Sequence, residues 1–131
     1  MHNQEQPVSE FKSKSGLKRI FSAFFYSVDG LKHAAQYEQA FRQELVLVIV
    51  GTIIALMLPI SAFQKLALIA VLVLVLIVEL LNSAVEAVVD RVSLERHPLS
   101  KNAKDFGSAA VLLSLFLVAA TWGVVLYNRF L

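Results

Sequence analysis

The stretch Phe106–Asn128 reads FGSAAVLLSLFLVAATWGVVLYN, which is 23 consecutive residues without a charge. A second uncharged stretch of 20 residues runs from Leu45 to Gln64. A helix of about 20 mostly apolar residues is long enough to cross a hydrocarbon core of roughly 30 Å. Between the two, Leu66–Val78 adds 13 uncharged residues that lead into Glu79. We therefore expect three membrane-spanning helices, one of which carries a carboxylate near its end.

The overall composition agrees with a small membrane domain. The chain has 131 residues, of which 57% are hydrophobic, and its mean hydropathy is +0.67. So short a chain makes one domain, and a soluble core of that size could not bury this much apolar surface. No cleavable secretion signal is expected, because the first long apolar run starts only at Leu45. The chain has no cysteine, which excludes disulfides and thiolate chemistry.

Basic residues are distributed unevenly along the chain, and this predicts its orientation. Ten of the twelve lie before the first span or between the second and third, whereas two lie at the opposite ends of the spans. Cytoplasmic loops of membrane proteins carry the excess of Lys and Arg. We expect the N-terminus and the second connection in the cytoplasm and the C-terminus outside. The ten are Lys12, Lys14, Lys18, Arg19, Lys32, Arg42, Arg91, Arg96, Lys101 and Lys104, and the two are Lys65 and Arg129.

The expected organisation is an all-α membrane protein. A disordered tail is predicted over residues 1–12, an amphipathic helix over 14–36, and transmembrane helices over 39–58, 62–96 and 101–129. The amphipathic helix should lie flat at the cytoplasmic interface, or alternatively pack on the other helices. Small residues one turn apart, at Ala103 and Gly107 and at Ala119 and Gly123, permit close helix contacts. Because three short spans enclose little interior, we expect a homo-oligomer.

One polar stripe stands out on the second span. Glu79, Asn82, Ser83, Glu86 and Asp90 are spaced so that they share one face of a helix whose other positions are mostly apolar. A carboxylate inside the membrane boundary is costly unless it has a task or a partner. This favours a functional role for Glu79, whereas Asp90 could equally belong to a solvated helix face.

Two further clusters could complete a site. Glu38 precedes the first span at the level expected for Glu86, and Mg²⁺ is usually held by one or two carboxylates plus phosphates. Lys104 could neutralise a phosphate, with Ser108 one turn above it. The alternatives are a charged cap before the first span and an ordinary basic flank before the third. Any nucleotide site must be built from helix side chains, because the chain has neither a GxxxxGK[ST] loop nor a GxGxxG loop.

Three motifs together carry a family resemblance. They read EQAFRQE from Glu38, ELLNSAVEAVVDR from Glu79 and AKDFGSAAV from Ala103. In order and spacing they resemble the prokaryotic integral-membrane diacylglycerol kinases, and the resemblance runs from about Gly16 to the C-terminus. It implies a homotrimer of chains with a surface helix and three spans, and composite active sites at the cytoplasmic interface. The implied reaction transfers the γ-phosphate of ATP to the hydroxyl of 1,2-diacylglycerol, with Mg²⁺, giving phosphatidate in phospholipid recycling.

The resemblance also implies roles for single residues. Glu79 matches the catalytic base, Glu38 and Glu86 match the Mg²⁺ ligands, and Asn82 matches a polar residue beside the base, with Asp90 in a supporting place. The implied nucleotide-binding residues are Arg19, Tyr26, Glu38, Glu86, Glu95, His97, Lys104 and Asp105. The implied lipid-binding residues are Gln43, Glu44, Glu79 and Ser108, with Arg19, Ser27 and Lys65. The chain departs from the family pattern at Val28, where an interfacial Trp is common, and at Arg96, where a Tyr adjoins the nucleotide.

Two other functions remain as alternatives. An undecaprenol kinase would use the same chemistry on a polyprenyl alcohol, but the extended motifs and the lack of an evident fourth span favour diacylglycerol. A small multidrug or proton-coupled transporter also uses a membrane-embedded Glu. That class needs a substrate path near the middle of the bilayer, whereas the carboxylates here crowd towards one interface.

Overall fold

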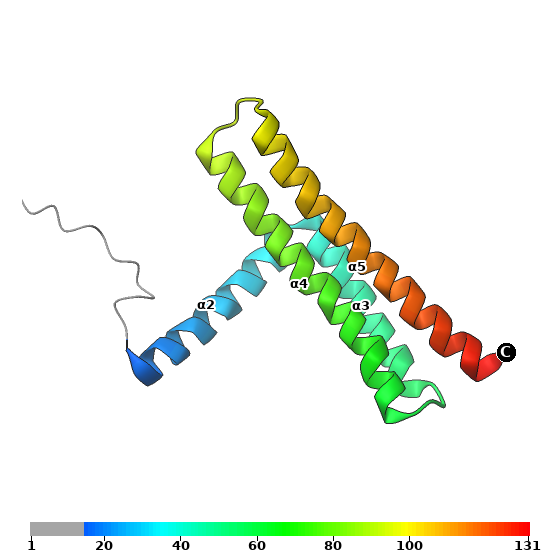
Figure 1. Ribbon diagram of the computed structural model, residues 1–131. Helices are drawn as coiled ribbons and strands as arrows, with labels where there is room; N and C mark the ends of the chain where they lie inside the picture. Colours follow the sequence, from blue (N-terminus) through cyan, green and yellow to red (C-terminus); the bar gives the residue numbers. More distant parts are fainter. Residues whose placement is uncertain (1–14) are drawn as a thin grey trace, which may run out of the picture. The chain divides into compact units, whose positions relative to one another are not determined.

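The computed structural model describes residues 15–131, and the tail expected over residues 1–12 lies outside this range. The described chain forms four helices, α2 (Gly16–Tyr37), α3 (Gln39–Met57), α4 (Ala62–Val92) and α5 (Pro98–Phe130) (Figure 1). Three of them, α3, α4 and α5, are long and apolar enough to cross a membrane. For the described residues, the prediction of an all-helical fold with three helices suited to cross a membrane is confirmed. The chain divides into two compact units, one ending at Tyr37 and one starting at Glu38.

The first unit contains α2. Its sequence places large apolar residues at helical spacing, among them Leu17, Ile20 and Phe24, and all three side chains are exposed. Within the described residues of this unit α2 is the single element, so its apolar face meets no other helix of the same unit.

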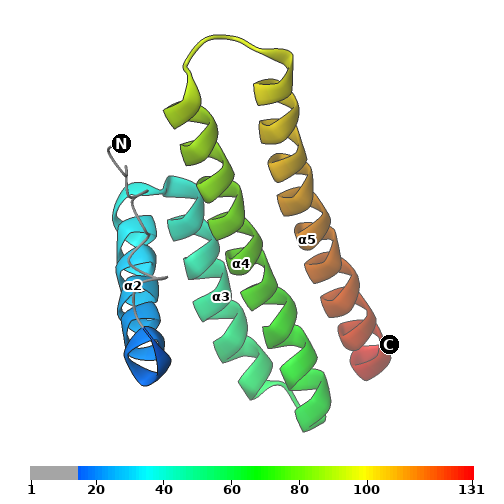
Figure 2. The ribbon, with the colours of Figure 1, turned by 60° about the vertical axis from the view of Figure 1, so that its left-hand side comes forward.

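In the second unit α4 lies between α3 and α5 and packs against both (Figure 2). Leu68, Leu72 and Val75, on one side of α4, are the largest fully buried side chains of the described chain. Gly51 of α3 faces this row so closely that a Cβ there would lie 2.5 Å from Leu72 Cδ1. The glycine thus lets the two helices approach, as small residues do between membrane helices.

The turn between α3 and α4 is held by a dense set of hydrogen bonds. Ser61 caps α4 in a capping box, in which its hydroxyl accepts from Gln64 N at 3.1 Å and Gln64 Oε1 accepts from Ser61 N at 3.1 Å. Lys65 Nζ donates to Leu56 O at 2.9 Å, and Arg129 Nε donates to Pro59 O at 2.7 Å. The end of α5 is therefore tied to the same turn, which lies at the opposite end of the bundle from the α4–α5 connection (Figure 1).

Two helix ends differ from the sequence-based expectation. The second span was expected to run to Arg96, but α4 ends at Val92. Ser93 adopts extended backbone and its hydroxyl accepts from Glu95 N at 3.0 Å, so a local side-chain bond replaces the helical one. The third span was expected from residue 101, but α5 begins at Pro98, the first-turn position that proline favours. Residues 93–97 thus form an open connection and not helix.

The spans expose most of their apolar side chains. Of the 18 most apolar consecutive residues, 22% are buried within the chain in α3 and in α4, and 11% are buried in α5. Apolar side chains that face outward suit the lipid tails of a bilayer, or further helices packed against them.

Candidate active site

Glu79 is the one charged residue of the described chain that is buried. It lies on α4, one turn beyond the packed row that ends at Val75, and only 6% of its surface is exposed. A carboxylate in such a position is costly unless it is paired or used in chemistry. The sequence predicted a functional role for Glu79 and not its burial, so the burial is a finding of the structure and the role stays a prediction.

Glu44 of α3 meets Glu79 of α4. Their side chains lie within hydrogen-bonding reach of each other. Two ionised carboxylates only accept hydrogen bonds, so the contact becomes a bond when a proton is shared between them. Glu44 Oε2 is buried and has no donor within the described chain. The Glu44–Glu79 pair therefore offers hydrogen-bond acceptors that suit a ligand group with a donor hydrogen, such as a hydroxyl.

Glu38 and Glu86 complete a cluster of four carboxylates from two helices. Both interact electrostatically with Glu79. Glu38 stands at the N-cap of α3, yet its side chain makes no capping hydrogen bond. This disfavours the alternative in which Glu38 only caps the helix. We name Glu38, Glu44, Glu79 and Glu86 the carboxylate cluster.

The carboxylate cluster offers oxygen ligands that suit Mg²⁺. Within residues 15–131, no three His, Asp or Glu side chains are arranged to hold a metal by themselves. Mg²⁺ is commonly bound by one or two carboxylates, with substrate phosphates and waters as the remaining ligands. Two carboxylates that meet an incoming phosphate group are sufficient for that mode of binding.

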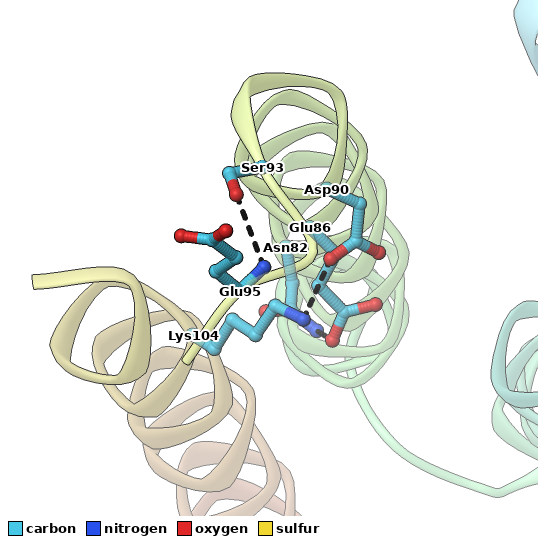
Figure 3. A network of polar contacts seen from close by, with 6 residues as sticks. All are labelled: Asn82, Glu86, Asp90, Ser93, Glu95 and Lys104. Carbon is cyan, nitrogen blue, oxygen red and sulfur yellow. Dashed lines mark hydrogen bonds and ion pairs between the residues drawn. The ribbon is translucent and has the colours of Figure 1, made fainter. Parts of the chain in front are cut away.

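Lys104 reaches from α5 to α4 beside the cluster. Its Nζ lies 2.7 Å from Asp90 Oδ1, and it also interacts electrostatically with Glu86 (Figure 3). The two side chains are 44% and 49% exposed, so the ion pair adds little to stability. The ion pair instead positions Lys104, because it holds the ammonium group near the carboxylate cluster. Asp90 therefore has an ion-pair partner on another helix, and its role in the site stays a prediction.

A cavity of about 690 Å³ opens along the α4–α5 connection. Its volume lies in the range of small-molecule sites. Four of the residues expected around a nucleotide line it: Glu95, His97, Lys104 and Asp105. The sequence analysis did not assign Ser93, Ser100 and Lys101, which line it as well. Lys101 had a usable signal, because it stands four residues before Asp105 and forms an ion pair with it.

Not every expected site residue comes to this end of the bundle. Lys65 lies near the start of α4, 14 residues and about 21 Å along the helix from Glu79, and bonds to the α3–α4 turn. Gln43 and Ser108 are exposed. Arg19, Tyr26 and Ser27 lie on α2, in the other compact unit.

Comparison with known proteins gives consistent matches over most of the chain. Residues 25–126 match the family described as prokaryotic diacylglycerol kinase. A diacylglycerol kinase of Pseudomonas aeruginosa is 53% identical over 118 residues, covering 90% of this chain and 96% of the relative. The diacylglycerol kinase of Escherichia coli K12 is 47% identical over 116 residues, covering 88% and 95%. One of Helicobacter pylori J99 is 41% identical over 119 residues, covering 88% and 93%.

Proposed function

The chain belongs to the prokaryotic diacylglycerol kinase family, and from this premise we propose that its carboxylate cluster performs the phosphoryl transfer. The protein is a membrane-spanning lipid kinase that phosphorylates diacylglycerol with ATP. The observation that supports the proposed site best is the buried Glu79 in reach of Glu44, with Glu38 and Glu86 close enough to interact with it electrostatically. The product, phosphatidate, would return diacylglycerol to phospholipid synthesis.

Glu79 acts as the general base in this proposal. A buried carboxylate on a rigid helix can accept the proton of a lipid hydroxyl as that oxygen attacks the γ-phosphate. Glu44 provides a second acceptor at the same point, so the hydroxyl is oriented before its proton moves. Gln43 and Ser108, with Ser27, Lys65 and Arg19, would contact the remainder of the lipid.

Glu38 and Glu86 would hold Mg²⁺, which when bound neutralises charge on the phosphates of ATP. These two residues come from different helices, so the α3–α4 packing fixes their separation. Glu86 lies two helical turns, about 10 Å, beyond Glu79 along α4. This spacing lets a lipid hydroxyl reach the base from the membrane while the nucleotide approaches from water.

Lys104 would stabilise the charge on the transferred phosphoryl group. Positioning and charge neutralisation are what phosphoryl transfer chiefly requires of a protein. Asp90 holds Lys104 in place through their ion pair. The cavity at the α4–α5 connection would take the nucleotide through Glu95, His97 and Asp105. Arg19 and Tyr26 of α2 are further nucleotide contacts that the family resemblance implies.

We further propose that the active protein is a homotrimer in the bacterial inner membrane. The N-terminus and the carboxylate cluster would face the cytoplasm, with α2 as an amphipathic helix on that surface. The uneven distribution of Lys and Arg supports the orientation. The family resemblance supports the trimer, and the exposed apolar side chains of α5 leave a surface for neighbouring chains.

Purified in detergent micelles with MgATP, the protein should convert diacylglycerol to phosphatidate, because the chain has the family motifs and an enclosed base. Radiolabelled ATP and lipid extraction measure the product, and undecaprenol serves as the competing substrate in a parallel reaction. Phosphorylation of undecaprenol without diacylglycerol would contradict the substrate assignment and leave the kinase chemistry intact. Proton or drug flux in vesicles, without either lipid product, would support the transporter alternative.

Mixing two inactive variants should restore part of the activity if sites are shared between chains. Glu79→Gln and Arg19→Ala proteins are co-refolded and assayed for phosphatidate, because the two residues belong to different compact units of the chain. Some sites in mixed trimers would then combine the intact carboxylate cluster of one chain with the intact Arg19 of another. Crosslinking confirms that mixed trimers form. If they form and remain inactive, both residues of each site come from one chain.

A further inference from the structure

Gly107 of α5 faces α4 at very short range. A Cβ added at residue 107 would lie 2.2 Å from Asn82 Oδ1 and 3.2 Å from Asn82 Cγ. Carbon atoms do not approach an oxygen within 3.0 Å without displacement. By contrast, a Cβ at Gly30 would have nothing within 4 Å. The space beside Gly107 is therefore occupied by one particular polar side chain.

Asn82 bridges from Gly107 to the carboxylate cluster. Its Nδ2 points towards Glu86 Oε1 at 3.5 Å (Figure 3), at the outer limit of a hydrogen bond. Its Oδ1 is buried and has no hydrogen-bond partner among residues 15–131. A Cβ takes the place of one Cα hydrogen, so this hydrogen of Gly107 is directed at Oδ1 as a weak C–H donor. The Asn82 amide thus fits between two neighbours: its Nδ2 faces the Glu86 carboxylate, and its Oδ1 faces the Cα of Gly107.

We infer that Gly107 is a positioning residue of the phosphoryl-transfer site. Because it lacks a side chain, Asn82 can keep its amide aimed at Glu86, and Asn82 in turn orients the Glu86 carboxylate. Groups that hydrogen-bond a metal-binding carboxylate commonly fix its orientation. The inference rests on the proposed function, in which Glu86 is a ligand of Mg²⁺.

Gly107→Ala should displace Asn82 and thereby disturb Glu86. Alanine is a better helix former than glycine, so a loss must come from the contact and not from helix propensity. We expect the unfolding midpoint of the metal-free protein to fall, and the free Mg²⁺ needed for half-maximal activity to rise about tenfold, the lower end for an outer-shell change. Circular dichroism in detergent and a Mg²⁺ titration of phosphatidate synthesis measure the two effects. Gly30→Ala makes the same change inside a helix where no described atom lies within 4 Å of the new Cβ. Its unfolding midpoint should not fall, and its Mg²⁺ requirement should be unchanged.

A double-mutant cycle decides whether Asn82 carries the effect. Asn82→Ala removes the atoms that the new methyl group would strike. The Gly107→Ala/Asn82→Ala protein should regain the unfolding midpoint lost in Gly107→Ala, and its Mg²⁺ requirement should equal that of Asn82→Ala alone. This comparison holds even if Gly107→Ala by itself folds poorly.

Three results would overturn the inference: an unchanged Mg²⁺ requirement in Gly107→Ala, a normal requirement in Asn82→Ala, or defects that simply add in the double variant. Additive defects would mean that Gly107 serves helix packing independently of Asn82. A Glu86→Gln protein with a normal Mg²⁺ requirement is a different outcome. It would remove the proposed metal ligand, whereas the recovery of the metal-free unfolding midpoint would still test the Gly107–Asn82 contact.

Discussion

Glu79→Gln is expected to slow phosphatidate formation by about 10²-fold or more, the low end for loss of a general base. Glutamine keeps the size and shape of the side chain but cannot accept the proton of the lipid hydroxyl. The change also removes one of four neighbouring carboxylates, so the unfolding midpoint should not fall. Turnover at saturating diacylglycerol and MgATP measures the effect, and equilibrium dialysis with nucleotide measures binding, which should persist.

A matched control for this variant is Asp29→Asn, which replaces an exposed carboxylate by its amide on α2, outside the carboxylate cluster. It should retain near-normal turnover. If Glu79→Gln also turns over at a near-normal rate, Glu79 is not the base. Glu44 would then be the next carboxylate to substitute, because it is in reach of the same position.

Glu86→Gln and Glu38→Gln should each raise the Mg²⁺ requirement by at least about tenfold, since losing a ligand should exceed the lower bound for an outer-shell partner. Each variant keeps the base, so high Mg²⁺ should recover part of the turnover. Phosphatidate synthesis as a function of free Mg²⁺ at fixed ATP measures the shift. Glu79→Gln, assayed alongside, should show low turnover with an unchanged requirement.

An unchanged Mg²⁺ dependence in both variants would remove Glu38 and Glu86 from the metal site. A shift in only one of them would assign the metal to that residue. The other residue would then contribute only its negative charge and would not bind the metal.

The spans and the stripe on α4 could be predicted from the sequence because both are properties of a single helix. An uncharged run of 23 residues predicts a span by its length, and the spacing of Glu79 and Glu86 sets one face of α4. The predicted end of α4, at Arg96, was wrong, because the helix ends at Val92. The residue before a proline is a common helix end, which favours a stop near His97–Pro98, whereas the hydroxyl of Ser93 ends the helix earlier.

Contacts between helices could not be predicted in the same way. The meeting of Glu44 with Glu79 depends on how α3 and α4 pack, and this packing depends on the space that Gly51 leaves for Leu72. The pairing of Lys104 with Asp90 likewise joins two helices across the open connection. The periodicity of one helix does not determine how two helices are aligned along each other. Periodicity does not predict the number of chains in the assembly either, because an apolar outer face suits lipid and a second chain equally.

Direct counting of bound Mn²⁺, used in place of Mg²⁺ and followed by electron paramagnetic resonance with a non-hydrolysable ATP analogue, tests the division of roles most directly. In the proposed mechanism Glu79 takes the proton, and Glu38 and Glu86 hold the metal. We expect Glu79→Gln to bind Mn²⁺ as the wild type does although it is nearly inactive, and Glu86→Gln to lose most of the bound ion at the same concentration. Equal loss in both variants, or equal retention in both, would contradict this division of roles.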